Sequence, residues 1–593
     1  MNCAECGAPN DNAARFCIHC GAPLPSIVPA PPEPLPAVEP RRPRRWLRWV
    51  VIAGLASLLL VMLCGAVLLG VYFFLGFNHT NQTARMVPAD TPMLISFSPD
   101  PRQAVHFRTA EDAQAALAAF GAIPAVRDAA EEIADQLAQD LDIEWQRDIM
   151  SWIGPEVSVA ILGTEAGAGD VPPMILTAAT RNQARSDAFL AKLRQGTEGE
   201  GVEYAEEEYK GVHIVYAVPE YDGAFAPAFA TVKGLVVIGS DLGVVHQAID
   251  TSSTRSTAKL VDEEMYKRVM DQLPANRLGY LYMSSQALLG DLQDAEAQLG
   301  LGSPQATGIS FSLDGDGVRL DYVVSIDPES LSATQMEAVP ALANRRQTAA
   351  LLPSETVVYL TGQGLAAAWE TTLASNADTE SFQATLDEIR TETGVDLVDD
   401  VISRLTGEFA LALLPDPAGL FGQDTPPVGL IIVAQSEEPE ELKASLDKLI
   451  KSLEEEGVVL DQDQIDGTAF TLLQISPDEG EIGYGLKGDQ LIIGSSREML
   501  RAAVRGGDQP LSDDETFRAA IKPLPSRAAS YLFVDMDKAV RLIYETMGAA
   551  EKADFDENVR PYLEPFRAIS MGAEPVDKEG MARGMLFLYI RQE

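Results

Sequence analysis

Short apolar runs alternate with amphipathic stretches along most of this 593-residue chain. Apolar residues at three- and four-residue spacing over 110–119 and 440–453 predict helices, whereas the runs 157–162 and 491–494 have the length of buried strands. Strands that follow one another directly, mixed with helices, favour an α+β fold with largely antiparallel sheets over a doubly wound parallel sheet.

The pattern also repeats, with a period of about 250 residues. Segment 148–162 returns without a gap as 400–414. The motif Pro-Ala-Asp-Thr at 88–91 returns as Pro-Ser-Glu-Thr at 353–356. Further matches keep the same order along the chain: Pro172-Pro173 with Pro426-Pro427, Lys233-Gly234 with Lys487-Gly488, Leu273-Pro274 with Leu524-Pro525, and a closing hairpin at 308–326 with one at 568–590. We therefore predict two tandem similar modules, 86–330 and 349–593, joined by a connector at 331–348.

One apolar stretch is much longer than a strand. It begins at Val50, ends at Leu75 and contains no charged residue. As a helix it is about 39 Å long, at about 1.5 Å per residue, which is enough to cross a hydrocarbon core of about 30 Å. A cleaved signal peptide is the alternative, but its apolar region would be shorter and closer to the N-terminus. The sequence thus predicts one transmembrane helix over 49–77, with the lipid bilayer as its partner.

Arginines on one side of this stretch predict its orientation. Arg41, Arg42, Arg44, Arg45 and Arg48 precede it, and Lys and Arg near a membrane helix remain on the cytoplasmic side. We expect a single-pass protein of the cell membrane, with a cytoplasmic N-terminus and an extracytoplasmic C-terminal region. Residues 25–48 form a linker, rich first in proline and then in arginine, and the proline-rich part is expected to be extended.

Four cysteines precede that linker in two pairs of Cys-x-x-Cys spacing. Cys3, Cys6, Cys17 and Cys20 supply four thiolates for a tetrahedral zinc ion, as in a zinc ribbon over residues 1–24. His19 lies inside the second pair, but four cysteines already complete the coordination. Four protein ligands leave no position for a water molecule, so the predicted zinc is structural. Docking of a cytoplasmic protein is the role we expect for the ribbon.

Two family resemblances follow from these motifs. Residues 1–24 resemble the short zinc-ribbon modules at the N-termini of many bacterial membrane proteins. The Pro-Ala-Asp-Thr motif, the Ile-Gly-Ser strand ends at 238–240 and 493–495, and the anchored architecture resemble the bacterial domain of unknown function 3352 family, over nearly all of 86–593. The resemblance implies no activity and no catalytic residue.

Three groups of residues could carry other chemistry. Gly483-Tyr-Gly485-Leu-Lys-Gly488 matches a dinucleotide-binding pattern, but it leads into a strand where that motif needs a helix, so a hairpin is favoured. Asp314-Gly-Asp316-Gly317 suggests a calcium loop or a hairpin turn, and the hairpin signal is the stronger. Asp461, Asp463 and Asp466 allow the same two interpretations, and weak calcium binding stays open for both groups.

Catalysis by a Ser-His-Asp or Cys-His arrangement would need His106, His213 or His246, and no catalytic motif surrounds any of them. Catalysis by a pair of carboxylates, one as acid and one as base, stays open, because acidic residues are so numerous that their spacing does not identify a pair. The chain holds 88 Asp and Glu against 45 Lys and Arg, for a net charge of −43. Such a surface repels nucleic acid.

These observations favour a non-enzymatic protein that binds an envelope ligand or partner, with the ribbon docking a protein inside the cell. One alternative is an extracytoplasmic hydrolase that uses carboxylates in a cleft. Another is a transmembrane sensor that links ligand occupancy outside to the ribbon inside.

Overall fold

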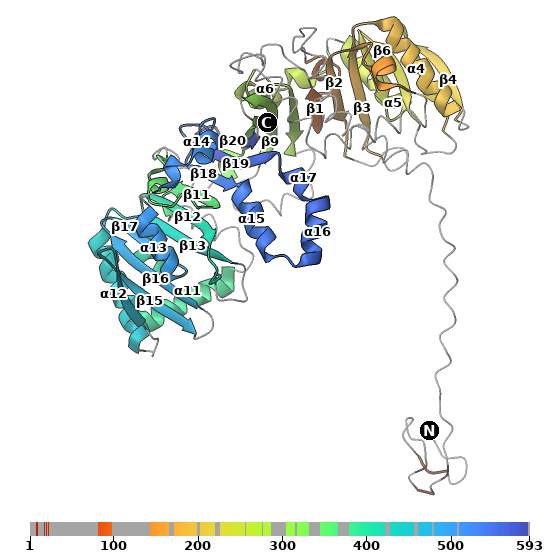
Figure 1. Cartoon of the computed structure of the whole chain (residues 1–593). Helices are drawn as coiled ribbons and strands as arrows, with labels where there is room; N and C mark the ends of the chain where they lie inside the picture. The colour runs from red at the N-terminus through yellow and green to blue at the C-terminus, as the bar shows by residue number, and fades with distance from the viewer. Residues whose placement is uncertain are drawn as a thin grey trace. The chain divides into compact units, whose positions relative to one another are not determined.

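The computed structural model (Figure 1) divides into two compact units, Met1–Gly54 and Leu55–Glu593. It describes residues 7–9, 17, 19–20, 22, 81–97, 143–164, 171–198, 202–219, 226–254, 256–275, 277–285, 304–314, 317–330, 344–365, 379–420, 427–455, 460–476, 480–506 and 509–590. The helix predicted over 110–119 and the apolar stretch from Val50 to Leu75 lie outside these ranges. Within the ranges, no helix is both long enough and apolar enough to cross a membrane.

A 20-stranded antiparallel sheet dominates the described part of the second unit. Its first half-sheet consists of β1 (Met93–Phe97), β2 (Ile153–Ile161), β3 (Met174–Thr180), β4 (Tyr204–Tyr209), β5 (Val212–Ala217), β6 (Ala228–Val232), β7 (Leu235–Gly239), β8 (Gly279–Ser284), β9 (Pro304–Asp314) and β10 (Gly317–Ile326). Its second half-sheet consists of β11 (Val358–Gln363), β12 (Glu408–Pro415), β13 (Val428–Gln435), β14 (Leu460–Ile465), β15 (Thr468–Ser476), β16 (Gly480–Lys487), β17 (Gln490–Gly494), β18 (Ser530–Asp535), β19 (Phe566–Ala573) and β20 (Met581–Ile590).

Both half-sheets have the same strand order. The first runs β4-β5-β6-β7-β3-β2-β1-β8-β9-β10. The second runs β14-β15-β16-β17-β13-β12-β11-β18-β19-β20. β10 pairs with β20, with Asp321 opposite Met585, so the two half-sheets form one sheet. The predicted mixed fold with a largely antiparallel sheet is confirmed, and the continuity through β10 and β20 is a feature that the sequence did not predict.

Helices lie between the strands in chain order. In the first half they are η1 (Thr83–Arg85), the single π turn η3 (Trp145–Ile149), α4 (Gln183–Glu198), α5 (Leu242–Ser253), η5 (Leu260–Asp262), α6 (Glu264–Gln272) and η6 (Pro328–Ser330). In the second half they are η7 (Gln347–Ala350), α11 (Thr379–Thr393), the π turn η8 (Leu397–Val401), η9 (Ile402–Arg404), α12 (Pro439–Glu455), α13 (Arg497–Arg505), η11 (Leu511–Asp513), α14 (Glu515–Ile521), α15 (Met536–Thr546), α16 (Ala549–Asn558) and α17 (Arg560–Leu563).

Local sequence explains where several elements turn or begin. The β4–β5 turn holds Lys210 and Gly211 at φ 51° and 78°, and the β14–β15 turn holds Asp466-Gly467 at 48° and 85°. Positive φ at both central residues is what a two-residue hairpin of type I′ requires, and glycine adopts it without strain. At the start of α5, Asp241 accepts a hydrogen bond from the Val244 amide (3.0 Å), which satisfies one open helix donor.

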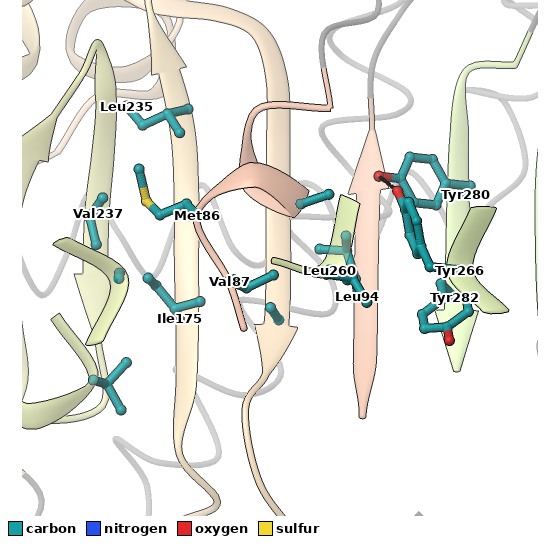
Figure 2. Packing of buried hydrophobic residues seen from close by; sticks show 14 of the residues in the cluster. Met86, Val87, Leu94, Ile175, Leu235, Val237, Leu260, Tyr266, Tyr280 and Tyr282 are labelled. Atoms are coloured by element: carbon teal, nitrogen blue, oxygen red, sulfur yellow. Dashed lines mark hydrogen bonds between the residues drawn. The ribbon is translucent and has the colours of Figure 1, made fainter. Parts of the chain in front are cut away.

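The main cores lie on one face of the sheet. α5 packs on β6 and β7, and α6 on β9 and β10; in the second half-sheet α13 packs on β13, β16 and β17, and α14 on β18 and β19. Figure 2 shows part of the first core, in which Leu94, Ile175 and Val237 of the strands and Leu260 of η5 are fully buried. A smaller cluster includes Leu442 of α12 and lies on the opposite face of the second half-sheet.

Candidate functional site

The described part of the predicted ribbon contains the second cysteine pair. Cys17 is buried and Cys20 is exposed. The His19 amide donates to the Cys17 sulfur (3.4 Å), and the Cys17 amide donates to the Ala22 carbonyl (2.8 Å). An amide aimed at a cysteine sulfur two residues earlier stabilises a thiolate, so this turn fits a metal-binding knuckle. Cys3 and Cys6 lie outside the described residues.

No group of three or more His, Cys, Asp or Glu side chains in the described ranges is arranged to hold a metal ion. Since two of the four predicted zinc ligands fall outside those ranges, the four-cysteine zinc site stays a prediction. The same is true of the segment from Val50 to Leu75 as a membrane anchor.

The glycine-rich segment is a hairpin, as its sequence context predicts. Lys487 at the end of β16 pairs with Gln490 at the start of β17. A Cβ at Gly483 would come within 2.6 Å of Leu472 and 2.5 Å of Leu500, so this glycine lets α13 approach the sheet. No helix follows the motif directly, and the dinucleotide interpretation has no structural support.

The aspartates of the second calcium candidate are held by arginines. Arg497 donates to Asp461 (2.5 Å), to Asp463 (3.1 Å) and to Glu481 (3.1 Å). These hydrogen bonds hold the pKa of Asp461 below its ordinary value. Arg505 donates to Asp466 (2.6 Å), which lies in the β14–β15 turn. Carboxylates already matched by guanidinium groups are poor candidates for a calcium site.

The first calcium candidate also lies at a hairpin. Asp314 ends β9 and pairs with Gly317, which starts β10. Asp314 is 3.8 Å from the Arg319 guanidinium. Asp316 lies outside the described residues, so calcium binding at this turn stays a prediction.

The described histidines of the sheet region have structural contacts. His246 of α5 bonds through Nε2 to the Glu207 carboxylate, and its ring stacks on Tyr209 with centroids 4.0 Å apart. His213 of β5 is largely exposed and lies 3.7 Å from Glu206. His106 lies outside the described residues. Neither described histidine is placed against a serine or cysteine nucleophile.

A buried carboxylate that sequence reasoning did not single out is the best-defined polar feature of the first half-sheet. Glu156 of β2 is only 1% exposed. It accepts hydrogen bonds from the amides of Gln82 and Thr83, both at 2.7 Å. We call this arrangement an amide clamp. It fixes the start of η1, and with it the chain that enters the sheet region.

The second half-sheet has the same amide clamp. Glu408 of β12 accepts from the amides of Gln347 (3.0 Å) and Thr348 (2.8 Å) and from the Thr348 hydroxyl (2.6 Å). Both glutamates occupy the same place in the gapless match of 148–162 with 400–414. A glutamate that recurs at the same place of two matched, largely apolar segments is the signal that could have revealed them.

Beside the first amide clamp lies a cluster of buried tyrosines (Figure 2). The hydroxyls of Tyr266 and Tyr280 are 3.0 Å apart, and the Tyr280 hydroxyl is 3.5 Å from Asn81 Oδ1. Burial raises the pKa of Tyr266 to about 12 and that of Tyr280 well above its ordinary value. Both phenols therefore stay neutral hydrogen-bonding groups at physiological pH.

Other buried acids in the described ranges also have partners. Asp321 accepts two hydrogen bonds from Arg319, at 2.7 and 2.6 Å. Asp416 accepts from the Ser496 hydroxyl (2.6 Å). Asp535 caps α15 through the Lys538 amide (2.9 Å) and contacts the Lys538 ammonium (2.8 Å). Each acid is paired with a donor and not with a second acid.

These features define a class: a mixed protein built on a long antiparallel sheet, with an N-terminal segment of the zinc-ribbon type. The zinc-ribbon domain family matches residues 2–24. The family described as protein of unknown function (DUF3352) matches residues 51–590. The chain belongs to the DUF3352 family, and both resemblances seen in the sequence are confirmed.

Solved structures and curated proteins add little to the family assignment. The chain is similar to crystal form I of TP0453, with 6% identity, a TM-score of 0.22, and coverage of 41% of this chain and 78% of that chain. For crystal form III of TP0453 the values are 8%, 0.25, 44% and 88%. At these TM-scores the likeness supports no conclusion about fold or function. No curated protein matches the chain significantly.

Proposed function

We propose that this chain is a single-pass membrane protein whose extracytoplasmic region, residues 86–593, binds or scaffolds an envelope ligand or protein without catalysing a reaction. The anchor is the segment from Val50 to Leu75, and the N-terminal side is cytoplasmic. Length and lack of charge support the anchor, and the preceding arginines support the orientation. The family match supports treating the anchor and the sheet region as parts of one protein, since it spans 51–590.

The proposal includes two tandem modules, 86–330 and 349–593, as the units of this region. The identical strand order of the two half-sheets supports it. So do the amide clamps at Glu156 and Glu408. The register supports it as well, because Asp321 and Met585, which lie at matching places in β10 and β20, face each other. A local twofold relation between the modules would produce this register.

The partners of the buried carboxylates are the observation that carries the non-enzymatic proposal. A carboxylate-dependent hydrolase needs two acids facing one cleft, about 5 to 10 Å apart. The buried acids of the described ranges instead accept hydrogen bonds from amides, hydroxyls or cations; they are Glu156, Asp321, Glu408, Asp416 and Asp535. This pattern favours carboxylates that hold chain segments in place.

For the cytoplasmic side we propose a structural zinc ion held by Cys3, Cys6, Cys17 and Cys20. The knuckle at Cys17 and the family match over residues 2–24 support this proposal. Tetrathiolate zinc would stabilise the fold of a segment too short to form its own core. The ribbon would then present a small rigid surface for a protein partner.

Protease treatment of intact cells tests the orientation. Added protease should degrade residues 86–593 while an N-terminal epitope tag survives, and the tag should become sensitive only after the membrane is permeabilised. Loss of the tag in intact cells, with the sheet region protected, would contradict the proposal.

Metal analysis of the purified full-length protein tests the ribbon. We expect about one zinc per chain, and loss of most of that zinc in Cys17→Ser because three thiolates bind far more weakly than four. Cys64→Ser is the matched control, since this fifth cysteine lies in the proposed anchor. Unchanged zinc content in Cys17→Ser would exclude the proposed ligand set.

A further inference from the structure

A buried arginine in the first half-sheet has an incomplete set of partners. Arg277 precedes β8 and is 6% exposed. One terminal nitrogen, Nη1, donates to the Pro274 carbonyl (3.0 Å), and the guanidinium lies over the Tyr280 ring at 5.1 Å from its centroid. The Nε donor is buried and has no hydrogen-bond partner. Nη2 makes no hydrogen bond to a described residue either, so the edge of the guanidinium formed by Nε and Nη2 has no hydrogen-bond partner.

That edge has no ion-pair partner in the described ranges, although the charge of Asp271 acts on Arg277 from a greater distance. No ion pair joins Arg277 to an Asp or Glu among the residues that the structure describes. Burial lowers the pKa of Arg277, but an arginine side chain remains protonated in proteins. A buried cation without a hydrogen-bonded anion is unfavourable, and the Nε–Nη2 edge is the one that pairs with a carboxylate through two parallel hydrogen bonds.

A second buried donor without a partner lies beside the same tyrosine. Ser310 of β9 stands directly opposite Tyr280 of β8 in the sheet register. Ser310 is fully buried, and its hydroxyl has no hydrogen-bond partner. Tyr280 is thus next to two buried groups that can each donate to a ligand.

The second half-sheet lacks both donors at the matching positions. Tyr531 takes the place of Tyr280, with Ala528 three residues before it and Gly572 opposite it in β19. The Tyr531 hydroxyl donates to Pro525 (2.7 Å), the carbonyl that matches the one bonded by Arg277. Arg346 lies over the Tyr531 ring, at 4.6 Å from its centroid, but it is partly exposed. Of the two matching tyrosines, Tyr280 is therefore the one that has buried donors without partners beside it. In the second half-sheet the Nε of Arg583 in β20 also lacks a hydrogen-bond partner, but this arginine is paired with Glu574 and Asp577.

We propose that Arg277 anchors a carboxylate-binding site beside Tyr280 and Ser310. The Nε–Nη2 edge of Arg277 would bind the two carboxylate oxygens, and the Ser310 hydroxyl would donate to a further polar atom of the ligand. The ligand is a small organic acid or the terminal carboxylate of a short peptide. This inference gives a ligand chemistry to the proposed binding role and rests on that role for its biological meaning. Its failure would leave the zinc and orientation measurements unaffected.

Thermal unfolding and calorimetry of the full-length protein with acetate test the site. At constant ionic strength, acetate should raise the unfolding temperature saturably, while neutral acetamide should have no effect. Alanyl-alanine and its C-terminal amide distinguish the two ligand sources: a peptide site binds the acid form more tightly than acetate, and a small-acid site does not. A response to phosphate equal to that of acetate would overturn the carboxylate assignment.

Matched variants attribute the response to Arg277. Arg277→Ala installs the residue found at position 528, and Arg277→Met keeps an apolar stem; both should abolish the acetate response. Without acetate, Arg277→Met should unfold at a higher temperature than the wild type, because it removes an unpaired buried charge. Arg277→Lys should bind acetate about tenfold more weakly, since it loses the two-pronged geometry.

Arg346→Met, at the matching tyrosine of the second half-sheet, should leave the acetate response unchanged. A wild-type protein that does not respond to acetate, or an Arg277→Met protein that responds like the wild type, would overturn the proposal. Near-ultraviolet circular dichroism of each variant shows whether it is folded, and Ser310→Gly, which also copies the second half-sheet, provides a milder change. Ser310→Gly should weaken alanyl-alanine more than acetate.

Discussion

A hairpin turn joins the two outermost strands of each half-sheet. One position of this turn is positively charged in the first half-sheet and negatively charged in the second. In the first half-sheet Lys210 contacts Asp250 of α5 (2.5 Å), whereas in the second Asp466 contacts Arg505 of α13 (2.6 Å). Both pairs tie a turn to the helix that packs on it. The comparison teaches that both half-sheets have a charged link at this place, and that either direction of charge provides one.

The amide clamps show the opposite behaviour, because both half-sheets keep the same residue there. Glu156 and Glu408 each receive two backbone amides in a buried setting. Water cannot replace the carboxylate at a buried site, and few other side chains can accept two amides at once. Burial thus restricts the chemistry of the amide clamps, while exposure leaves the turn–helix pair free to vary.

The largest effect is expected from removing the amide clamps. Glu156→Ala and Glu408→Ala should each lower the free energy of unfolding by about 3 kcal/mol, because each leaves one buried and one partly buried amide without an acceptor. Urea denaturation measures the effect. Glu208→Ala, at an exposed residue of β4, is the control and should change little. A large loss in one half-sheet with none in the other would show that the two clamps are not equivalent.

A pH-dependent effect of intermediate size is expected at Asp148, in the π turn η3. Hydrogen bonds from Arg147 and Lys192, all at 2.9 Å, hold the pKa of Asp148 well below its usual range, although burial opposes them. A lowered folded-state pKa gives stability that is present above the unfolded value, near pH 4, and is lost as the pH falls toward the folded value. Asp148→Asn should therefore reduce the loss of stability below about pH 4.

The matching position in the second half-sheet provides the control for that measurement. Asp400 accepts from the Asp396 amide (2.9 Å), as Asp148 does from the Glu144 amide (2.9 Å). In the described ranges no Lys or Arg side chain donates to the Asp400 carboxylate. The measurement is the urea concentration at the unfolding midpoint as a function of pH. Below about pH 4, the midpoint of Asp400→Asn should stay closer to that of the wild type than the midpoint of Asp148→Asn does. An equal change in both variants would mean that the cations at Asp148 have no effect.

The smallest effect is expected from exchanging the exposed charge pairs. Lys210→Asp should destabilise the protein slightly, by placing two carboxylates together. Lys210→Asp with Asp250→Arg recreates the arrangement of the second half-sheet and should recover the loss. Exposed ion pairs are weak and screened, so the difference between single and double variants should shrink at about 1 M salt. Failure of the double variant to recover would show that the two turn–helix links are not interchangeable.

Much of the fold could be predicted from the chain because it depends on short-range patterns. The strand expected over 491–494 lies within β17 (Gln490–Gly494), and the helix expected over 440–453 lies within α12. The hairpin interpretation of the Gly483–Gly488 motif was correct because a glycine-rich turn between alternating strands is a local signal. The matched segments 148–162 and 400–414 both end in strands, β2 and β12.

The candidate sites were predicted less completely. The aspartates at 461–466 allowed a hairpin turn or weak calcium binding, and their partners Arg497 and Arg505 lie more than 30 residues further along the chain. Glu156 was not recognised as a special residue, because its amide partners come from residues 82–83. Contacts between segments so far apart depend on packing, which a sequence pattern does not encode directly.

The sequence by itself determined the order of elements, the family and the resemblance to a zinc ribbon, since each follows from local spacing of apolar, cysteine and turn residues. Only the tertiary structure decided that β10 pairs with β20 in one sheet, and which buried polar groups find partners. Glu156 and Arg277 are both charged residues next to apolar strands in the sequence. In the folded protein Glu156 receives hydrogen bonds from two backbone amides, whereas one edge of the Arg277 guanidinium has no hydrogen-bond partner. The difference arises because the partners of a buried group depend on which segments pack against it.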